Sequence, residues 1–337
     1  MLISTKPMAA VNDILSTQNL AVGYRNGKQE NCVLCDLQLT LRQGELVCLL
    51  GSNGIGKSTL LRTLSGVQRP LSGTVMLNGR DLADYTKRQL SQLISIVYTD
   101  RTLAGALTVR ELVSLGRHPY TGFFGRLDSE DEQVVADAMT TMGIAHKAGC
   151  HVATLSDGER QKAMIARALA QETPIILLDE PTAFLDVASR IETMKCLHRL
   201  AVEKNKAILL SSHDVSQSLA LANRLWLLRS DRKMVQGVTE DLVLGGQLDR
   251  LFDGRQVQFD SMVGDFVALA DVRQSVALDC ADELLRHWIV NALAREGYVV
   301  AADAAIKITA TSSTVIVVDN KAVNSISAMI GYLSTKA

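Results

Sequence analysis

The sequence predicts an α/β protein built around parallel strands, with a smaller α/β appendage after it. Short continuous apolar runs occur at 46–50, 175–178 and 207–210, and each is followed at once by glycine or polar residues. Runs of this kind are typical of strands buried on both faces. A segment of helical period, 191–200, separates the last two runs and indicates a crossover helix. Ligands of such folds bind at the carboxyl ends of the strands.

Length and composition are those of a globular chain of about two domains. The 337 residues are 47% hydrophobic and 21% charged, which excludes a disordered chain. The 35 basic and 36 acidic side chains nearly balance, which argues against an electrostatically driven nucleic-acid binder. No uncharged apolar run approaches the ~20 residues that span a bilayer, and the first eleven residues lack a signal-peptide pattern. We therefore expect a cytoplasmic protein with no nucleic-acid partner.

The first stretch, to about residue 82, is rich in strand and turn signals. Asn-Gly pairs at 26–27 and 78–79 follow short apolar segments and predict two hairpin turns. The apolar run 46–50 ends at Gly51 and predicts a buried strand. The sheet of this stretch therefore leads directly into a glycine-rich loop.

The second stretch, 85–161, is predicted to be mainly helical. Ser129 and Glu132 have the spacing of a capping box, and apolar residues follow at helical spacing up to Met142. Gly143 then marks the end of that helix.

The last stretch, from about Gly246, contains no catalytic motif. Its pattern predicts a helix at 284–292, strands at 298–300, 306–309 and 314–318, and a helix at 322–333. About 70 residues are enough for a small packed α/β unit.

Six cysteines are scattered along the chain, and only Cys32 and Cys35 have the spacing of a metal or redox pair. No further pair lies nearby to complete the roughly four ligands that zinc requires. The two cysteines lie in an apolar run that leads into alternating leucines. We expect buried, reduced thiols here, with a redox motif as the alternative.

The segment after the first buried strand has the P-loop pattern of two glycines around four residues, followed by Lys-Ser. A helix-favouring run, 59–65, follows it and gives the required strand–loop–helix context. The glycines allow several backbone N–H groups to point at phosphates, assisted by the helix N-terminus. Lys57 is placed to neutralise the β- and γ-phosphates, and the Ser58 hydroxyl to bind Mg²⁺.

Charged groups follow two other buried strands. Asp179 and Glu180 end the run 175–178, where Asp179 is placed to hold Mg²⁺ and Glu180 to orient and deprotonate the attacking water. His213 follows the run 207–210 and is expected near the γ-phosphate, where an imidazole stabilises the transition state.

The order and spacing of these motifs resemble the nucleotide-binding subunit of an ABC transporter over residues 20–253. The segment 155–161 resembles the family signature, 184–186 the D-loop, His213 the switch histidine, and Tyr24 the aromatic residue that stacks on adenine. The resemblance implies a P-loop NTPase (RecA-like) core with an antiparallel β subdomain and a helical signature subdomain. The implied ATP-binding residues are Tyr24, Gly51, Ser52, Asn53, Gly54, Ile55, Gly56, Lys57, Ser58 and Thr59.

The resemblance also assigns domains and further sites. The ABC ATPase domain would cover 14–250, with its helical subdomain at about 85–165 and an accessory domain at 251–337. Implied catalytic residues are Glu180, His213 and Lys57; signature residues are Leu155, Ser156, Asp157, Gly158 and Glu159; Mg²⁺ ligands are Ser58 and Asp179, with Asp186 in the D-loop. Two such chains would clamp two ATP molecules head to tail, each signature capping the partner's γ-phosphate.

Two positions depart from the family pattern. Asp157 replaces the first signature glycine and would bring a carboxylate near a polyanion, so we expect it to face solvent or a basic neighbour. The Q-loop glutamine that should follow the strand 93–97 is missing. Thr99 aligns best with it and would reach Mg²⁺ through water, and Asp100 is the alternative.

The segment 108–127 resembles importers of iron–siderophores, haem and vitamin B12. Tyr120, Phe123 and Phe124 lie among glycines and suit a patch that receives a helix of a membrane permease; packing within their own subdomain is the alternative. The resemblance implies a subunit that a membrane permease holds at the cytoplasmic face of the inner membrane. A substrate-binding protein would deliver the cargo to that permease.

An iron–siderophore is the first expectation for the cargo, and cobalamin or haem the alternative. An exporter-type ABC ATPase and a soluble ABC ATPase are the rival classes. The soluble class is disfavoured because only about 120 residues, without sustained heptads, separate Lys57 from Asp179.

Overall fold

The computed structural model describes residues 13–27, 29–98, 106–122, 125–253, 256–268 and 273–335. Contacts divide the chain into an N-terminal unit, Met1–Arg255 with Phe259–Phe266, and a C-terminal unit, Gln256–Gln258 with Val267–Ala337. In the described part of the chain, no helix has both the length and the apolar character needed to cross a membrane.

The central sheet of the N-terminal unit has six strands in the order β11-β10-β4-β9-β8-β7. All neighbours pair in parallel except β10 and β11, which are antiparallel. The strands are β4 (Leu46–Gly51), β7 (Ile94–Val97), β8 (Ile175–Leu178), β9 (Ala207–Ser212), β10 (Arg224–Leu228) and β11 (Met234–Val238). Every residue of β4, β8 and β9 is buried. The three predicted buried strands and their parallel pairing are therefore confirmed.

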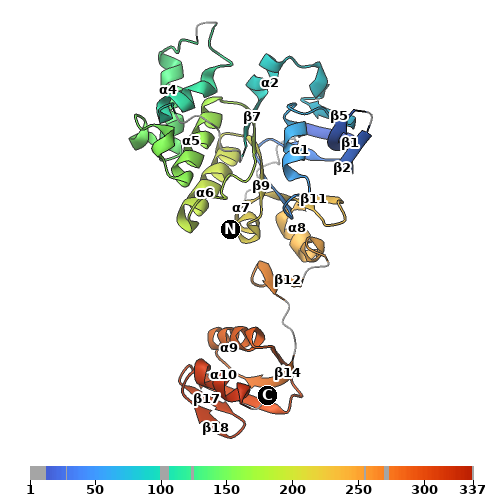
Figure 1. Ribbon diagram of the computed structural model, residues 1–337, viewed down its shortest axis with the longest axis vertical. Coiled ribbons are helices and arrows are strands. Elements are labelled where there is room, and N and C mark those ends of the chain that lie inside the picture. The colour runs from blue at the N-terminus through green and yellow to red at the C-terminus, as the bar shows by residue number, and fades with distance from the viewer. Residues whose placement is uncertain are drawn as a thin grey trace, which may run out of the picture. The chain divides into compact units, whose positions relative to one another are not determined.

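Helices cover both faces of this sheet (Figure 1). Val47 and Leu49 of β4 join a core with α1 (Lys57–Leu64), whereas Cys48 and Leu50 join a second core on the opposite face. The second core includes α5 (Asp157–Ala170), α6 (Val187–Glu203), α7 (Val215–Leu221) and α8 (Thr239–Leu244). The predicted crossover helix is α6, which joins β8 to β9. The central sheet is thus fixed between two apolar layers, with its carboxyl edge left for polar groups.

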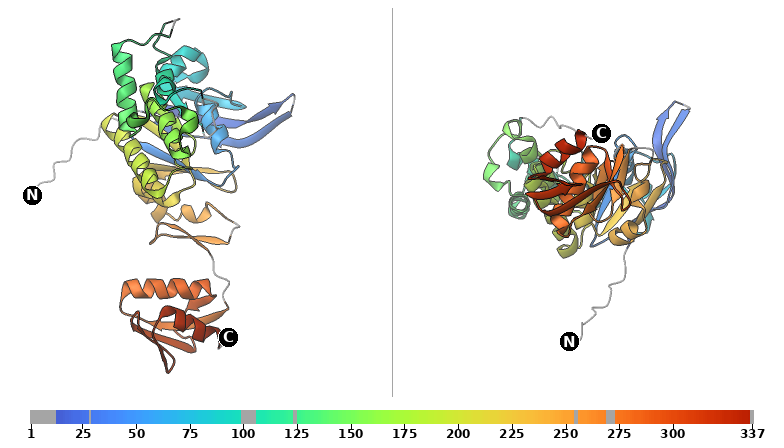
Figure 2. Two further views of the ribbon diagram at one scale, coloured as in Figure 1. Left: turned by 60° about the vertical axis from the view of Figure 1, so that its left-hand side comes forward. Right: turned by 90° about the horizontal axis from the view of Figure 1, so that it is seen from below.

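A second, antiparallel sheet lies beside the α1 face, with strand order β2-β1-β5-β6 and β3 paired to β1. Its strands are β1 (Asp13–Asn26), β2 (Gln29–Leu37), β3 (Thr40–Arg42), β5 (Ser72–Leu77) and β6 (Arg80–Asp81). Asn26 pairs with Gln29 and Leu77 with Arg80, so both predicted hairpins are confirmed. Figure 2 shows the β1–β2 hairpin, in dark blue, extending from the body of the unit.

The expectation of reduced, buried thiols at Cys32 and Cys35 is wrong. The two sulfur atoms are bonded at 1.99 Å, Cys32 is half-buried, and Cys35 is exposed. Residues three apart in a regular strand have Cα atoms about 10 Å apart, but these lie 6.5 Å apart. Register shifts in the pairing with β1 interrupt the alternation of β2 at this point. Cys48, Cys150, Cys196 and Cys280 are free.

The helical region contains α2 (Lys87–Leu93), α3 (Val109–Ser114) and α4 (Ser129–Thr141), and α5 packs against α3 and α4. Helix α4 is confirmed, but its predicted capping box is not. The cap is Asp128, which accepts from the Asp131 backbone N–H, while the Asp131 carboxylate accepts from the Asp128 N–H. An ion pair between Asp131 and Arg117 favours this register over the one that begins with Ser129.

The C-terminal unit is a five-stranded sheet, β15-β14-β16-β17-β18, with its own core. Its elements are β14 (Gln274–Asp279), α9 (Glu283–Arg295), β15 (Tyr298–Val300), β16 (Ile306–Ser312), β17 (Val315–Val318), β18 (Lys321–Val323) and α10 (Ile326–Ser334). Buried and exposed residues alternate along β16, so one face of the sheet is covered and the other is open. The predicted start of the last helix is wrong: residues 321–323 pair with β17, and Ser325 caps α10.

Short elements complete the chain. The 3₁₀ turns are η1 (Leu82–Asp84), η2 (Leu115–Arg117), η3 (Ala145–Lys147), η4 (Val152–Thr154) and η5 (Leu248–Arg250), and the pair β12 (Val257–Asp260) and β13 (Asp265–Ala268) forms a two-stranded sheet.

Candidate active site

The P-loop, 51–58, connects the buried strand β4 to helix α1. Gly56 is the N-cap of α1 at φ +123°, a conformation that side chains other than hydrogen rarely adopt. A Cβ there would also lie 2.6 Å from Val33 Cγ1, and a Cβ on Gly51 would lie 2.8 Å from the Leu228 carbonyl oxygen. Both glycines are therefore required by the backbone path that exposes the start of α1.

Lys57 is folded back over this loop and is only 5% exposed. Its Nζ donates to the Gly51 carbonyl at 2.8 Å and to the Ser52 carbonyl at 3.3 Å, and lies 3.8 Å from Glu180 Oε1. Burial lowers the pKa of Lys57, and the neighbouring carboxylates of Glu180 and Asp179 oppose that shift. The Lys57 ammonium is thus held beside the P-loop by hydrogen bonds to the Gly51 and Ser52 carbonyl oxygens.

Asp179 and Glu180 directly follow strand β8, as the sequence predicts. Asp179 is 6% exposed and accepts from the Ser211 hydroxyl at 2.7 Å. The Glu180 backbone N–H donates to the same hydroxyl at 2.9 Å. Ser211 of β9 thus contacts both of the acidic residues that follow β8. Glu180 also has φ +47°, a strained conformation that turns its side chain away from the strand direction.

His213 follows strand β9 and faces the same edge. Its Nδ1 lies 3.7 Å from Glu180 Oε2, and the side chain is 52% exposed. Lys57 and His213 therefore lie on either side of the Glu180 carboxylate, one buried and one open to solvent. This edge presents a cation, a carboxylate and an imidazole around one point, and such groups can support phosphoryl transfer to water.

Tyr24 lies at the end of β1 with its ring 46% exposed. Its hydroxyl and the Thr59 hydroxyl are 2.9 Å apart, which ties the ring to the first turn of α1. Val33 and Leu34 of β2 pack against Gly56 from the same side. An exposed aromatic face beside the P-loop can stack on a nucleobase.

The oxygen donors around the loop suit Mg²⁺. Ser58 is half-buried in the first turn of α1. The buried Asp179 follows β8, which β9 separates from the P-loop strand β4. In the described residues no cluster of three or more His, Cys, Asp or Glu side chains forms a metal site. One hydroxyl and one carboxylate, with phosphate and water oxygens completing the set, is how Mg²⁺ is held beside nucleotides.

Comparison with known proteins decides the family. Residues 34–183 match the ABC transporter family, and residues 273–334 match the iron ABC transporter C-terminal domain. The chain is 38% identical over 249 residues, 74% of its length and 90% of the relative's, to the ferric enterobactin transport ATP-binding protein of Escherichia coli. The chain belongs to the ABC transporter ATP-binding proteins.

Other ABC proteins are similar to this cassette. It is 37% identical over 223 residues, 66% of the chain and 56% of the relative, to the cobalamin import ATP-binding protein of Halobacterium salinarum. A solved metal-chelate type ABC transporter in an inward-facing conformation aligns with TM-score 0.60 and 32% identity, over 72% of this chain and 89% of the other. A dimeric bacterial ABC cassette aligns with TM-score 0.57 and 27% identity, over 63% and 93%.

The predicted signature segment, 155–161, forms the start of helix α5. Ser156 is the N-cap and accepts from the Glu159 backbone N–H, while the Glu159 carboxylate accepts from the Ser156 N–H at 3.0 Å. Asp157, where the family has glycine, accepts from Arg160 at 2.7 Å. Its carboxylate therefore meets a basic neighbour on its own helix, one of the two placements that we expect for it.

The predicted D-loop, 184–186, leads into α6 next to the predicted signature segment. Asp186 caps α6 by accepting from the Ser189 backbone N–H at 2.8 Å, which lowers the pKa of Asp186. A Cβ on Gly158 would lie 3.2 Å from Leu185 Cδ2. The two predicted segments of one chain thus lie in contact, and a Cβ at position 158 would require the Leu185 side chain to shift slightly.

Some predicted residues lie outside the described part of the chain. Thr99 and Asp100 of the Q-loop and Phe123 and Phe124 of the apolar patch belong to this group. Tyr98, just before them, is described: its ring lies 5.5 Å from the Arg62 guanidinium, and its buried hydroxyl has no hydrogen-bond partner among the described residues.

Sequence reasoning missed Ser211 and Arg190. Ser211 is the only polar residue besides Ser212 in a strand that is otherwise apolar, and this isolation is the signal that could have identified it. Arg190 donates to Asp214 at 2.8 Å and so fixes the residue after His213. No local pattern indicates that contact, since it joins two helices 24 positions apart in the chain.

Proposed function

We propose that this chain is the ATP-hydrolysing subunit of an ABC importer that energises uptake of an iron chelate through a membrane permease. Its relatives include a ferric enterobactin transport protein, and its second family match is an iron ABC transporter C-terminal domain. The observation that carries the proposed ATPase activity is the convergence of Lys57, Glu180 and His213 at the carboxyl edge of the sheet.

In the proposed reaction, the P-loop N–H groups (Gly51 to Thr59) hold the phosphates and Tyr24 stacks on adenine. Lys57 balances charge on the β- and γ-phosphates. Bound through Ser58 and Asp179, Mg²⁺ would supply charge neutralisation on the phosphate oxygens.

Glu180 orients the attacking water and accepts its proton. His213 contacts the γ-phosphate as charge moves onto it. Ser211 holds the Asp179 carboxylate, the proposed metal ligand, and the backbone of Glu180, the proposed base.

The subunit is proposed to work as a pair. A dimeric ABC cassette is among the similar structures, and helix α5 offers a capped N-terminus to a partner's γ-phosphate. The signature residues of this contact are Leu155, Ser156, Asp157, Gly158 and Glu159, with Asp186 in the neighbouring D-loop. The Asp157–Arg160 ion pair offsets the negative charge that Asp157 brings to a phosphate site.

We also propose that the permease docks in a groove of about 550 Å³ between α2 and the end of α5, here called the docking groove. Val67, Lys87, Leu90, Leu115, Arg167 and Gln171 line it. Val67 and Leu115 are 66% and 50% exposed, and a helix of the permease would cover them. The subunit would be held in this way at the cytoplasmic face of the inner membrane, with the substrate-binding protein acting only through the permease.

The remaining assignments rest on the family pattern. We propose an ABC ATPase domain at 14–250, with its helical subdomain at about 85–165, and an accessory domain at 251–337. Thr99 remains our candidate for the water-mediated Mg²⁺ contact, and Asp100 is the alternative. If ATP turnover and transport were unchanged in a Thr99→Ala/Asp100→Ala variant, both would lose that role.

A cobalamin importer is the alternative function, because a cobalamin import ATP-binding protein is also a relative. This chain does not decide between the cargoes, since its proposed contacts are with nucleotide and permease. A haem importer is the remaining alternative.

Co-purification of the chain with its permease from native membranes tests the proposal. The complex, in proteoliposomes with its binding protein, should take up a ferric siderophore in a Mg²⁺- and ATP-dependent manner. Parallel assays with cyanocobalamin and haem decide the cargo. Lys57→Ala is the matched variant and should abolish both hydrolysis and uptake. Full turnover in Lys57→Ala, or no Mg²⁺-dependent nucleotide binding by the wild type, would overturn the assignment.

A further inference from the structure

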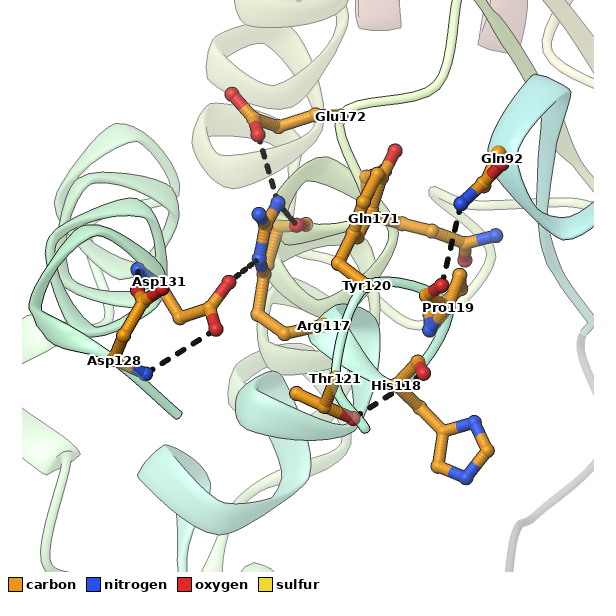
Figure 3. A network of polar contacts seen from close by, with 11 residues as sticks. Gln92, Arg117, His118, Pro119, Tyr120, Thr121, Asp128, Asp131, Gln171 and Glu172 are labelled. Atoms are coloured by element: carbon orange, nitrogen blue, oxygen red, sulfur yellow. Dashed lines mark hydrogen bonds and ion pairs between the residues drawn. The ribbon is translucent and has the colours of Figure 1, made fainter. Parts of the chain in front are cut away.

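Arg117, at the end of η2, lies in a buried network that joins three elements of the helical region (Figure 3). Its side chain is 7% exposed. Nε donates to Asp131 of α4 at 2.7 Å, and Nη1 donates to the Ala170 carbonyl at 2.9 Å and to Glu172 at 2.7 Å. The guanidinium therefore holds the last turn of α5 and the first turn of α4 at the same time.

This network is ionic. Burial by itself would lower the pKa of Arg117, but the hydrogen bonds to Asp131 and Glu172 outweigh burial and raise it. Arg117 thus remains a cation, and its planar fork meets two carboxylates in fixed directions. A lysine would keep the charge but could not reproduce this geometry.

Tyr120 adds a second tie to the same end of α5. Its ring lies 4.3 Å from the Arg117 guanidinium carbon, and its hydroxyl donates to the Gln171 carbonyl at 2.9 Å. The Gln171 side chain in turn donates to the carbonyls of Ser91 and Ile94, at 2.6 and 3.2 Å. Arg117 and Tyr120, here called the α5 clamp, therefore hold the end of α5, and Gln171 connects that end to helix α2 and strand β7.

The α5 clamp lies next to the docking groove, although Arg117 and Tyr120 do not line it. Leu115 and Gln171 both line the groove. Leu115 lies two positions before Arg117, and the Gln171 carbonyl accepts from the Tyr120 hydroxyl. Gly116 packs so closely on α5 that a Cβ there would lie 2.3 Å from the Arg167 carbonyl oxygen. The 115–120 segment is thus in direct contact with the end of α5.

Helix α5 carries the signature at its other end. It runs for 14 residues from Asp157 to Ala170, which is about 21 Å at 1.5 Å per residue. Ser156 caps the first turn, and the α5 clamp holds the last. One helix thus joins the docking groove to the segment that meets the partner's nucleotide.

We propose that Arg117 is a positioning residue that couples the permease to the signature through helix α5. The inference rests on the proposed function, and it assigns Arg117 no contact with ATP or with the permease. Tyr120 acts with it by holding the Gln171 carbonyl. The ring and hydroxyl of Tyr120 are engaged within the chain, which for this residue agrees with the alternative of packing in its own subdomain.

The test compares two ATPase rates in each variant: that of the isolated subunit and that of the subunit bound to its permease. Arg117→Lys should lower the permease-stimulated kcat by about five- to tenfold, while the isolated subunit keeps its kcat and its KM for ATP within about twofold. Tyr120→Phe, which removes only the hydroxyl, should lower the stimulated kcat by about two- to threefold. The two effects should be less than additive, because both variants release the same end of α5.

Arg110→Lys is the matched control, since Arg110 lies on the exposed face of the neighbouring helix α3. It should leave both rates unchanged. An equal loss of isolated and stimulated activity would reduce the α5 clamp to a structural role and overturn the inference, as would wild-type stimulation in both variants. If Arg117→Lys does not fold, Tyr120→Phe decides alone. A wild-type subunit that no permease stimulates would overturn the proposed function as well.

Discussion

At the carboxyl edge of the central sheet, Asp179, Glu180 and His213 each follow a buried strand by one or two positions. At the C-terminal end of α5, by contrast, the charged groups come from η2, from α4 and from Glu172, two positions after α5. In the first region the backbone itself brings the side chains together, because parallel strands end at one edge. In the second region, contacts between separate elements do so.

This difference determines what a substitution should change. At the sheet edge, a side chain can be altered while its strand remains in place, so chemistry should change more than stability. At the α5 clamp, the side chains are themselves the connection between elements, so stability and coupling should change while the isolated chemistry remains. Four variants test this contrast.

Glu180→Gln should have the largest effect. The amide cannot accept the proton of the attacking water, so kcat for ATP should fall by about 10²- to 10⁴-fold, with ATP still bound. Single-turnover hydrolysis and nucleotide binding measure the two quantities separately. Glu203→Gln, at the exposed end of α6, is the control. A turnover rate within twofold of the wild type would remove Glu180 from the role of base.

Asp131→Ala should cost about 3 kcal/mol of unfolding free energy, because it leaves the buried Arg117 without one of its carboxylates. The KM for ATP should not change. Chemical denaturation can be followed by Trp226, which is fully buried in the N-terminal unit, in a Trp288→Phe background that leaves it as the sole tryptophan.

Asp137 lies on the exposed side of α4, and Asp137→Ala serves as the control. Its free energy of unfolding should stay within about 0.5 kcal/mol of the wild type. If Asp131→Ala were as stable as Asp137→Ala, the ionic network would contribute nothing, and the contrast between the two regions would fail.

Ser211→Ala should lower kcat by about tenfold, an intermediate effect. The serine touches no substrate in the proposed reaction, but it orients Asp179 and receives the Glu180 N–H, so its loss misplaces both by a small distance. Ser212→Ala is the neighbouring control, because Ser212 accepts from Asp214 instead. Equal turnover in the two variants would mean that Ser211 holds only the fold.

The same contrast explains how far the sequence could be interpreted. The P-loop, Asp179, Glu180 and His213 could be predicted because short-range patterns mark the ends of buried strands. The cap of α4 could not: Asp128 and Ser129 are both good capping residues, and the ion pair of Asp131 with a distant arginine selects the first. The Cys32–Cys35 bond likewise depends on an irregular register between β1 and β2 that no residue pattern reveals.

In the C-terminal unit, the residues before the last helix carry a local turn signal that conflicts with the apolar spacing. Asp319 has φ +53° and, with Asn320, turns the chain so that 321–323 return along β17 before Ser325 caps the helix. An Asp-Asn pair followed by a serine marks a turn and then a cap. Apolar spacing alone extends the helix too far back.

Asp214→Asn should have the smallest effect, a decrease in Tm whose size depends on pH. Burial raises the pKa of Asp214, but hydrogen bonds from the Gln217 N–H, Arg190 and Ser216 outweigh it, so the pKa lies below its ordinary value of about 3.9. A carboxyl group with a lowered pKa stabilises the fold fully above that ordinary value and loses its contribution as the pH falls through the folded-state pKa. The wild type should therefore have the higher Tm at pH 7, by a margin that narrows below about pH 4. A margin that stays constant with pH would show that the Asp214 charge is not what joins α7 to Arg190. Asp214 would then belong with the strand-end residues, which the backbone places, and not with those held by contacts between elements.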